Sequence, residues 1–184
     1  MKKNHYQLFY LALITMLIIG IGCNDQKKPF DIIELLKNSK QVNLEKKVIP
    51  LLSEQVSKKI YVLASTSVCH DCIIHLSEVI NTVVTAHPAI KVCVLYQNVS
   101  QSSLRLELSI KTEQYLHVPY DLLFTDDKKE DNVFSHFQLE NGPTILCYSA
   151  TKSEPLQYFQ YSQLFDDIGN IRFGVQNKIF EFMR

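Results

Sequence analysis

The feature that most constrains the fold is a short apolar run that leads directly into a helical pattern. Residues 60–64 are continuously apolar, as expected for a strand that is buried on both faces of a sheet. From Cys72 onwards, apolar residues recur with the 3.6-residue period of an amphipathic helix, at positions 73, 76, 79, 80, 83 and 84. His87-Pro88 ends this pattern. A buried strand followed by an amphipathic helix predicts an α/β domain, in which helices cover a central sheet.

The rest of the chain supplies further elements of both kinds. Apolar runs predict more strands, at 90–96, 120–125 and 144–148, with a hairpin partner for the last at 156–161. Helix-spaced apolar residues predict helices at 30–37, 133–139 and 164–182. The last of these helices contains Gly169 and Gly174, which weaken it. Taken in order, the elements predict helices packed on both faces of one mixed sheet, a three-layer α/β/α sandwich.

Two segments carry conflicting patterns. Leucines in 98–118 alternate as in a strand, but they also share a helix face. We predict a helix there, because parallel strands need a crossover connection of this length. The apolar residues of 42–57 are helix-spaced, yet Pro50 would break or kink a long helix, so this segment stays ambiguous.

Length and charge exclude several classes of protein. The chain has 184 residues, enough for one ordinary domain with a single core. It holds 19 Lys and Arg against 19 Asp and Glu, so its formal net charge is zero. A nucleic-acid partner is therefore not expected, because binding phosphates requires a basic face. The high aliphatic content also excludes a largely disordered chain.

The first residues differ from the rest of the chain. Basic residues precede an apolar run at 8–21, which is short for a membrane span and typical of a signal peptide, predicted at 1–22. The run ends in small residues before Cys23, and this pattern resembles the lipidation site of bacterial lipoproteins. We therefore expect Cys23 to carry a lipid, with 23–29 as a tether to the membrane. The alternative is an uncleaved N-terminal anchor, and both alternatives place the domain outside the cytoplasm.

Between the buried strand and the helix stands a C-x-x-C motif, made of Cys69, His70, Asp71 and Cys72. The thiolate is the nucleophile of disulfide exchange, and the free N–H groups and dipole of a helix N-terminus favour it. Two intervening residues on a first helical turn allow the two sulfurs to bridge. Cys69 precedes the apolar stripe and is predicted to be the exposed attacking thiol. Cys72 begins the inward-facing stripe and would resolve the mixed disulfide.

With this motif in place, residues 58–184 resemble a thioredoxin-fold domain, in particular the anchored thioredoxin-like oxidoreductases of bacterial envelopes. The resemblance rests on the strand that leads into the C-x-x-C motif, on the strand–crossover–strand order, and on Gly142-Pro143 before a strand. It implies a domain at 30–184, with a core at 58–184 and a helical extension at 30–57. It also implies that Pro143 is a cis proline which, with Gly142, presents backbone to the substrate.

The chain departs from the family in three places. Val68 stands where Trp is usual before the first cysteine, and His70-Asp71 replaces the usual Gly-Pro. Leu63 stands where many members hold a buried acid. We expect His70 and Asp71 to tune the redox poise in opposite directions, because an imidazolium stabilises a thiolate and a carboxylate opposes it.

Cys93 and Cys147 fall inside predicted strands, where a free cysteine packs as a small hydrophobe. In the implied fold, the strand 60–64 lies between their two strands, which would separate them by roughly 9–10 Å. A disulfide allows a Cα separation of only about 7 Å. Both are therefore predicted to be unpaired thiols.

Two functions follow from these residues. The first is a thiol–disulfide oxidoreductase of the cell envelope, acting on protein thiols or disulfides and exchanging electrons with a partner redox protein. It needs no cofactor and no metal, because one C-x-x-C motif is a weak zinc motif even with His70 and His75 nearby. The alternative is a redox-inert thioredoxin-like lipoprotein that binds or assembles partners, with Cys69 and Cys72 forming a static structural disulfide.

Overall fold

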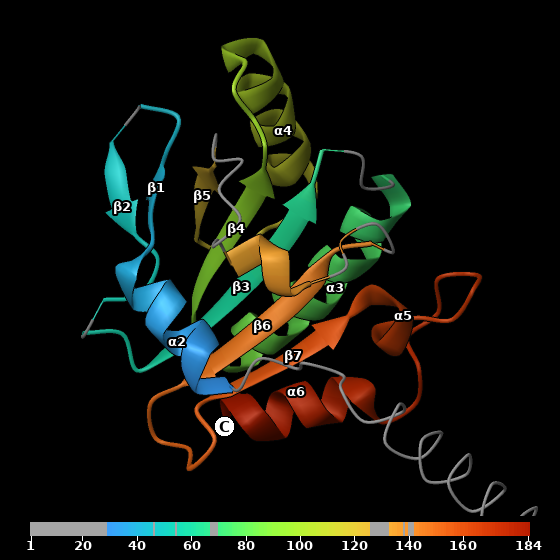
Figure 1. Cartoon of the computed structure of the whole chain (residues 1–184). Coiled ribbons are helices and arrows are strands. Elements are labelled where there is room, and N and C mark those ends of the chain that lie inside the picture. Colours follow the sequence, from blue (N-terminus) through green and yellow to red (C-terminus); the bar gives the residue numbers. More distant parts are fainter. Residues whose placement is uncertain are drawn as a thin grey trace, which may run out of the picture.

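One mixed sheet forms the centre of the protein (Figure 1). The structure is a computed structural model that describes residues 29–45, 47–53, 55–66, 70–125, 133–137, 139 and 142–184. The predicted signal peptide, Cys23 and Cys69 lie outside these described residues. The strands of the described part are β1 (Lys40–Val42), β2 (Val48–Pro50), β3 (Lys58–Ser65), β4 (Lys91–Gln97), β5 (Tyr120–Phe124), β6 (Thr144–Ser149) and β7 (Leu156–Gln160).

The strand order is β2-β1-β5-β4-β3-β6-β7. At the middle of the sheet, β3 pairs in parallel with β4 and antiparallel with β6. β4 also pairs in parallel with β5, while β7 forms an antiparallel hairpin with β6. The predicted strands and the mixed sheet are therefore confirmed.

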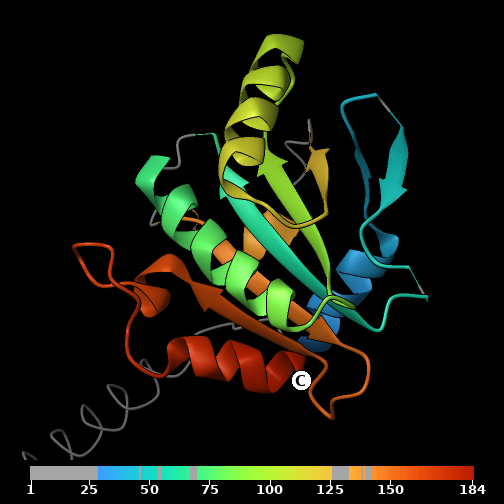
Figure 2. The same cartoon turned by 180° about the vertical axis from the view of Figure 1, so that it is seen from behind.

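Helices cover both faces of this sheet. They are α2 (Pro29–Asn38), α3 (His70–Ala86), α4 (Ser102–Tyr115), the 3-10 turn η1 (Val133–His136), α5 (Tyr161–Leu164) and α6 (Val175–Met183). α3 and α6 lie together on one face, and α2 and η1 lie on the other (Figures 1 and 2). The three-layer α/β/α class and the helix predicted within 98–118 are thus confirmed.

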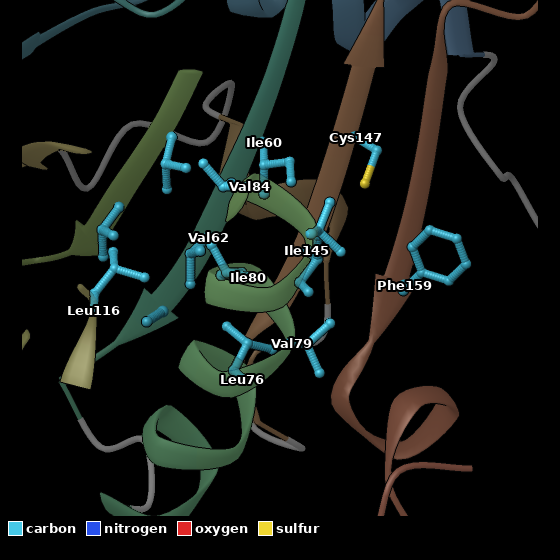
Figure 3. Close-up of a cluster of buried hydrophobic side chains, with 14 of the residues drawn as sticks. Ile60, Val62, Leu76, Val79, Ile80, Val84, Leu116, Ile145, Cys147 and Phe159 are labelled. Atoms are coloured by element: carbon cyan, nitrogen blue, oxygen red, sulfur yellow. The ribbon is translucent and has the colours of Figure 1, made fainter. Parts of the chain in front are cut away.

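The two-residue period of β3 divides the core between the two faces. Ile60 and Val62 point towards α3 and meet its apolar stripe, which includes Leu76 and Ile80 (Figure 3). Tyr61 and Leu63 join the cluster under α2. Each such side chain contributes about 1.5–3 kcal/mol by leaving water, which fixes β3 and the direction of α3.

Cys93 and Cys147 are buried free thiols, as predicted. β3 lies between their strands β4 and β6, which confirms the strand order behind the prediction. The structure adds a second reason for their separation. Cys147 belongs to the cluster on the α3 face and Cys93 to the cluster on the α2 face, so the sheet itself lies between them.

The predicted helical extension at 30–57 is wrong beyond residue 38. The ambiguous segment that starts at residue 42 contains β2, which pairs with β1 as a hairpin that joins the sheet beside β5. Asn43 holds the turn, because its side-chain oxygen accepts a hydrogen bond from the Lys47 N–H at 2.8 Å. Pro50 is tolerated because β2 is an edge strand, where a missing N–H breaks no ladder hydrogen bond.

The predicted helix at 164–182 is wrong in its first half. The chain forms only the short α5, then a loop at 165–174, and α6 begins at Val175. Gly169 takes φ +85°, a left-handed value that interrupts a right-handed helix. The Asp166 side chain closes the turn by accepting hydrogen bonds from the backbone N–H groups of Ile168 and Asn170.

Candidate functional site

Cys72 lies on the first turn of α3, the helix that follows β3 in the chain. Its side chain is half-buried. The first N–H groups of a helix have no acceptor within the helix, and the helix dipole is positive at this end, so both favour a thiolate. Asp71 is exposed on the same turn, and its negative charge acts against that thiolate. Cys69 and the side chain of His70 are outside the described part.

An open cleft of about 360 Å³ begins at Cys72. Its other wall comes from α5 and from the loop 165–174, which projects on the side of the sheet where α3 begins (Figures 1 and 2). The cleft is lined by Asp71, Cys72, His75, Tyr161, Ser162, Phe165, Asp166, Asp167, Ile168, Gly169 and Arg172. The cleft therefore joins the start of α3 to a segment about ninety residues later in the chain.

Three rings fix the inner part of the cleft. His75 Nδ1 and the Tyr161 hydroxyl are hydrogen-bonded at 2.8 Å. Tyr161 stacks on Phe165 with ring centroids 4.7 Å apart, and His75 lies 5.6 Å from Phe165. Gly169 completes the enclosure, because a Cβ at this position would overlap the Cε1 atom of His75. The imidazole, which projects from α3, is thereby held by contacts from the opposite wall.

Gly142 and Pro143 lie behind the cleft, in contact with its lining residue Tyr161. The Tyr161 N–H donates to the Pro143 carbonyl at 3.1 Å, and Pro143 is buried. Gly142 has φ +112°, and a Cβ there would lie 2.8 Å from Tyr161 Cβ, so this close approach requires glycine. Among the described residues no peptide bond is cis, and Pro143 is therefore trans. The cis proline implied by the resemblance is absent at this position.

The outer wall is a structured loop. Hydrogen bonds from the backbone of Asn170 and Ile168 lower the pKa of the Asp166 carboxyl below its usual value, so it stays ionised. The Arg172 Nε donates to the carbonyls of Ser162 and Phe165, at 3.1 and 2.9 Å. These bonds keep the loop against α5, so the wall of the cleft is formed before any partner arrives.

The predicted site residues fall into three groups. Asp71 and Cys72 line the cleft, whereas Gly142 and Pro143 support it from behind Tyr161. Cys23, Cys69 and the side chain of His70 lie outside the described part.

The sequence patterns do not indicate that Tyr161 and the loop 165–174 are parts of the site. The apolar pattern predicts a strand that ends at Tyr161 and a continuous helix at 164–182 in place of the loop. Gly169 was the sequence feature that could have revealed a loop there.

Within the part of the chain that the structure describes, no group of three or more His, Cys, Asp or Glu side chains could hold a metal ion. Among the same residues, no helix is both long and apolar enough to cross a membrane.

No protein-family model matches the sequence, and no characterised protein matches it in sequence either. The structure is similar to that of a secreted disulfide oxidoreductase of Mycobacterium tuberculosis homologous to E. coli DsbE. The TM-score is 0.51 at 12% identity, over 82% of this chain and 96% of that one. The chain has a thioredoxin-like fold.

Two further thioredoxin-like structures agree. The thioredoxin domain of a thiol–disulfide oxidoreductase from Bacteroides vulgatus matches with a TM-score of 0.53 and 9% identity, over 79% of this chain and 93% of that one. A thioredoxin-like protein from Aeropyrum pernix matches with a TM-score of 0.51 and 10% identity, over 73% and 89%. At these identities the likeness concerns the fold alone.

Proposed function

We propose that this chain is a thiol–disulfide oxidoreductase of the cell envelope, with Cys69 as the attacking thiol and Cys72 as the resolving thiol. One observation carries the proposal: Cys72 lies on the first turn of α3 and lines an open cleft. A helix N-terminus favours the thiolate that disulfide exchange requires. The cleft gives a substrate polypeptide access to that turn. The thioredoxin-like fold supports the same chemistry, because two of the similar structures named above are of disulfide oxidoreductases.

The proposed exchange has two steps. The Cys69 thiolate attacks one sulfur of a substrate disulfide, which forms a mixed disulfide and releases the other substrate sulfur as a thiolate. The Cys72 thiolate then attacks Cys69, breaks the mixed disulfide and releases the second substrate thiolate. The substrate gains two electrons and the Cys69–Cys72 pair loses two, so a partner redox protein must restore the dithiol. The same steps in reverse would oxidise a substrate.

His70, Asp71, Gly142 and Pro143 have supporting roles in this proposal. His70 and Asp71 would set the redox poise through their opposite charges. Gly142 and Pro143 would flank the bound substrate, and the bond from Tyr161 to Pro143 supports this by tying them to the cleft wall.

We further propose that Cys23 is lipidated after removal of residues 1–22, so that the domain at 30–184 is tethered to a bacterial membrane and faces the periplasm or the exterior. Metabolic labelling with a palmitate analogue should mark the wild-type protein and should be lost in Cys23→Ala. Labelling that persists in Cys23→Ala, or none in the wild type, would remove the lipid anchor.

The exchange function is tested by trapping. Cys72→Ser should accumulate mixed disulfides with envelope proteins, because Cys69 can attack but nothing resolves the adduct. Cys69→Ser should trap few, and the double variant should trap none. The adducts appear on a non-reducing gel and collapse with reductant. Pro143→Ala, combined with Cys72→Ser, should change how long the adducts persist.

The binding-module alternative also has an observation in its favour. Leu63, in place of the usual acid, is fully buried among apolar side chains, and Pro143 is trans. Both features differ from what the resemblance implies for an active enzyme. If neither single cysteine variant forms adducts, and the Cys69–Cys72 pair resists reduction at glutathione-like potentials, the binding module replaces the enzyme.

A further inference from the structure

His75 lies one helical turn after Cys72, and both line the same cleft. Side chains three residues apart on a helix have Cβ atoms about 5–6 Å apart, so the two belong to one face of α3. Imidazole is the side chain whose protonation ordinarily changes near neutral pH. The start of α3 therefore pairs a thiol with a proton acceptor.

The imidazole is positioned rather than free to rotate. Tyr161 holds Nδ1 at 2.8 Å, the Phe165 ring lies 5.6 Å away, and Gly169 leaves no room on its side. In the tautomer whose Nδ1–H donates to the Tyr161 oxygen, Nε2 carries a lone pair and can accept a proton. A surface histidine without a role in the site would not require such a fixed orientation.

The other charged groups that line the cleft are less suited to taking the proton of a thiol. Asp71 is exposed on the same turn, and Asp167 is exposed on the opposite wall. Asp166 already accepts two backbone N–H groups, and Arg172 donates to two carbonyls. Among the described residues that line the cleft, His75 supplies the only imidazole, a side chain whose neutral form has a nitrogen that can accept a proton.

We propose that His75, positioned by Tyr161, is the acid–base partner of Cys72. This rests on the proposed function. In the resolving step, the Cys72 proton moves to His75 Nε2, the thiolate attacks Cys69, and the bond between Cys69 and the substrate sulfur breaks. The imidazolium then gives its proton to the departing substrate thiolate. Electrons pass only between sulfurs, and the proton count is unchanged.

The test follows the reactivity of Cys72 itself, so it does not depend on turnover. The full-length chain with Cys69→Ser is alkylated with iodoacetamide between pH 5 and 10, and the rate at Cys72 is read by peptide mass spectrometry. With His75 present, Cys72 should be alkylated rapidly even at pH values well below about 8.5, the ordinary pKa of cysteine. His75→Asn retains a polar atom for Tyr161 but removes the base. It should slow Cys72 about tenfold at pH 7, where an unassisted thiol is only a few per cent ionised.

Two variants serve as comparisons. Tyr161→Phe keeps the stacked ring and removes the hydroxyl, so it should slow Cys72 in the same direction by a smaller factor. His87→Asn makes the same change just beyond the other end of α3, where His87 contacts Phe180, and should leave the profile unchanged. Circular dichroism of each variant establishes that it is folded.

The outcomes separate this proposal from the proposed function. The Cys69→Ser protein is the parent of these variants. If its Cys72 titrates as a single ordinary thiol, the role of His75 is overturned before any His75 variant is made. A folded His75→Asn whose rate at pH 7 stays within twofold of its parent would overturn it as well. If the His75 dependence is seen but Cys72→Ser traps no adducts, the acid–base pair stands and the oxidoreductase function falls.

Discussion

In the part of the chain that the structure describes, two regions hold cysteines, and they give the same side chain opposite properties. Cys93 and Cys147 lie inside strands with no exposed surface. Burial raises the pKa of the Cys93 thiol from 9.0 to about 12, and it also raises that of Cys147. Cys72 lies half-buried at the first turn of a helix and on the wall of an open cleft. The environment, rather than the residue type, decides which thiol can react.

The two regions are also built differently. The sheet interior is made from local apolar runs, each of which predicts a strand. The cleft is made from α3 and, about ninety residues later in the chain, from α5 and the adjoining loop 165–174. A site of this kind depends on specific contacts between its walls, so single substitutions should affect it more selectively than they affect the sheet.

The largest expected difference is in the reactivity of the thiols. A pKa three units higher lowers the thiolate fraction of Cys93 about 10³-fold at neutral pH. In the reduced native protein, iodoacetamide should label Cys72 in minutes and should reach Cys93 and Cys147 only after denaturation. Peptide mass spectrometry measures all three sites at once. Native labelling of Cys93 at the rate of Cys72 would break the comparison.

The loop 165–174 has one buried and one exposed phenylalanine, which form a matched pair. Phe165 is 2% exposed and stacks on Tyr161, whereas Phe173 is fully exposed on the same loop. Phe165→Ala should lower the free energy of unfolding by about 3–5 kcal/mol. Phe173→Ala should change it by no more than about 0.5 kcal/mol. Urea denaturation of the two variants measures the difference, and equal losses would mean that the loop is not packed as described.

Two glycines form a second matched pair, which separates the cost of backbone strain from the cost of a steric clash. Gly169 and Gly174 both have φ near +80°, but only Gly169 lies against His75, and nothing lies within 4 Å of a Cβ at Gly174. Gly174→Ala should cost about 1–2 kcal/mol from backbone strain alone. Gly169→Ala should cost about 1–3 kcal/mol more, because the methyl group must displace the imidazole. Thermal unfolding measures both, and a similar loss in the two variants would remove the contact with His75.

The smallest expected effect concerns the buried cysteines. Cys93→Ala should lower the free energy of unfolding by about 1 kcal/mol and leave adduct formation by Cys72→Ser unchanged. The combined variant and its Cys72→Ser parent are compared by non-reducing gel and urea titration. Loss of adducts in a stably folded combined variant would show that the sheet interior takes part in the chemistry.

Much of the fold could be predicted, because it depends on patterns that are local in the sequence. The apolar run at 60–64 and the stripe of α3 gave the central strand and the helix that carries Cys72. The prediction of a helix at 164–182 is wrong in its first half for a physical reason. Its apolar spacing was helical, but the hydrogen bonds of Asp166 and the left-handed Gly169 close a turn instead.

The site was predictable only in part. The spacing of Cys69 and Cys72 is a local pattern, so the sequence could point to it. The hydrogen bond between His75 and Tyr161 joins residues 86 positions apart, and it exists because the β6–β7 hairpin returns the chain to the start of α3. No periodicity reports a contact of that kind. The trans state of Pro143 likewise departs from what the resemblance implied.

The reduction potential of the Cys69–Cys72 pair tests the account most directly. The full-length protein is equilibrated with glutathione and dithiothreitol buffers of known potential, and the fraction of dithiol is measured by thiol trapping and mass spectrometry. An exchanging pair at a helix N-terminus should have a potential between about −270 and −120 mV. A potential below about −300 mV, which is typical of structural disulfides, would contradict the proposed function and favour a binding module.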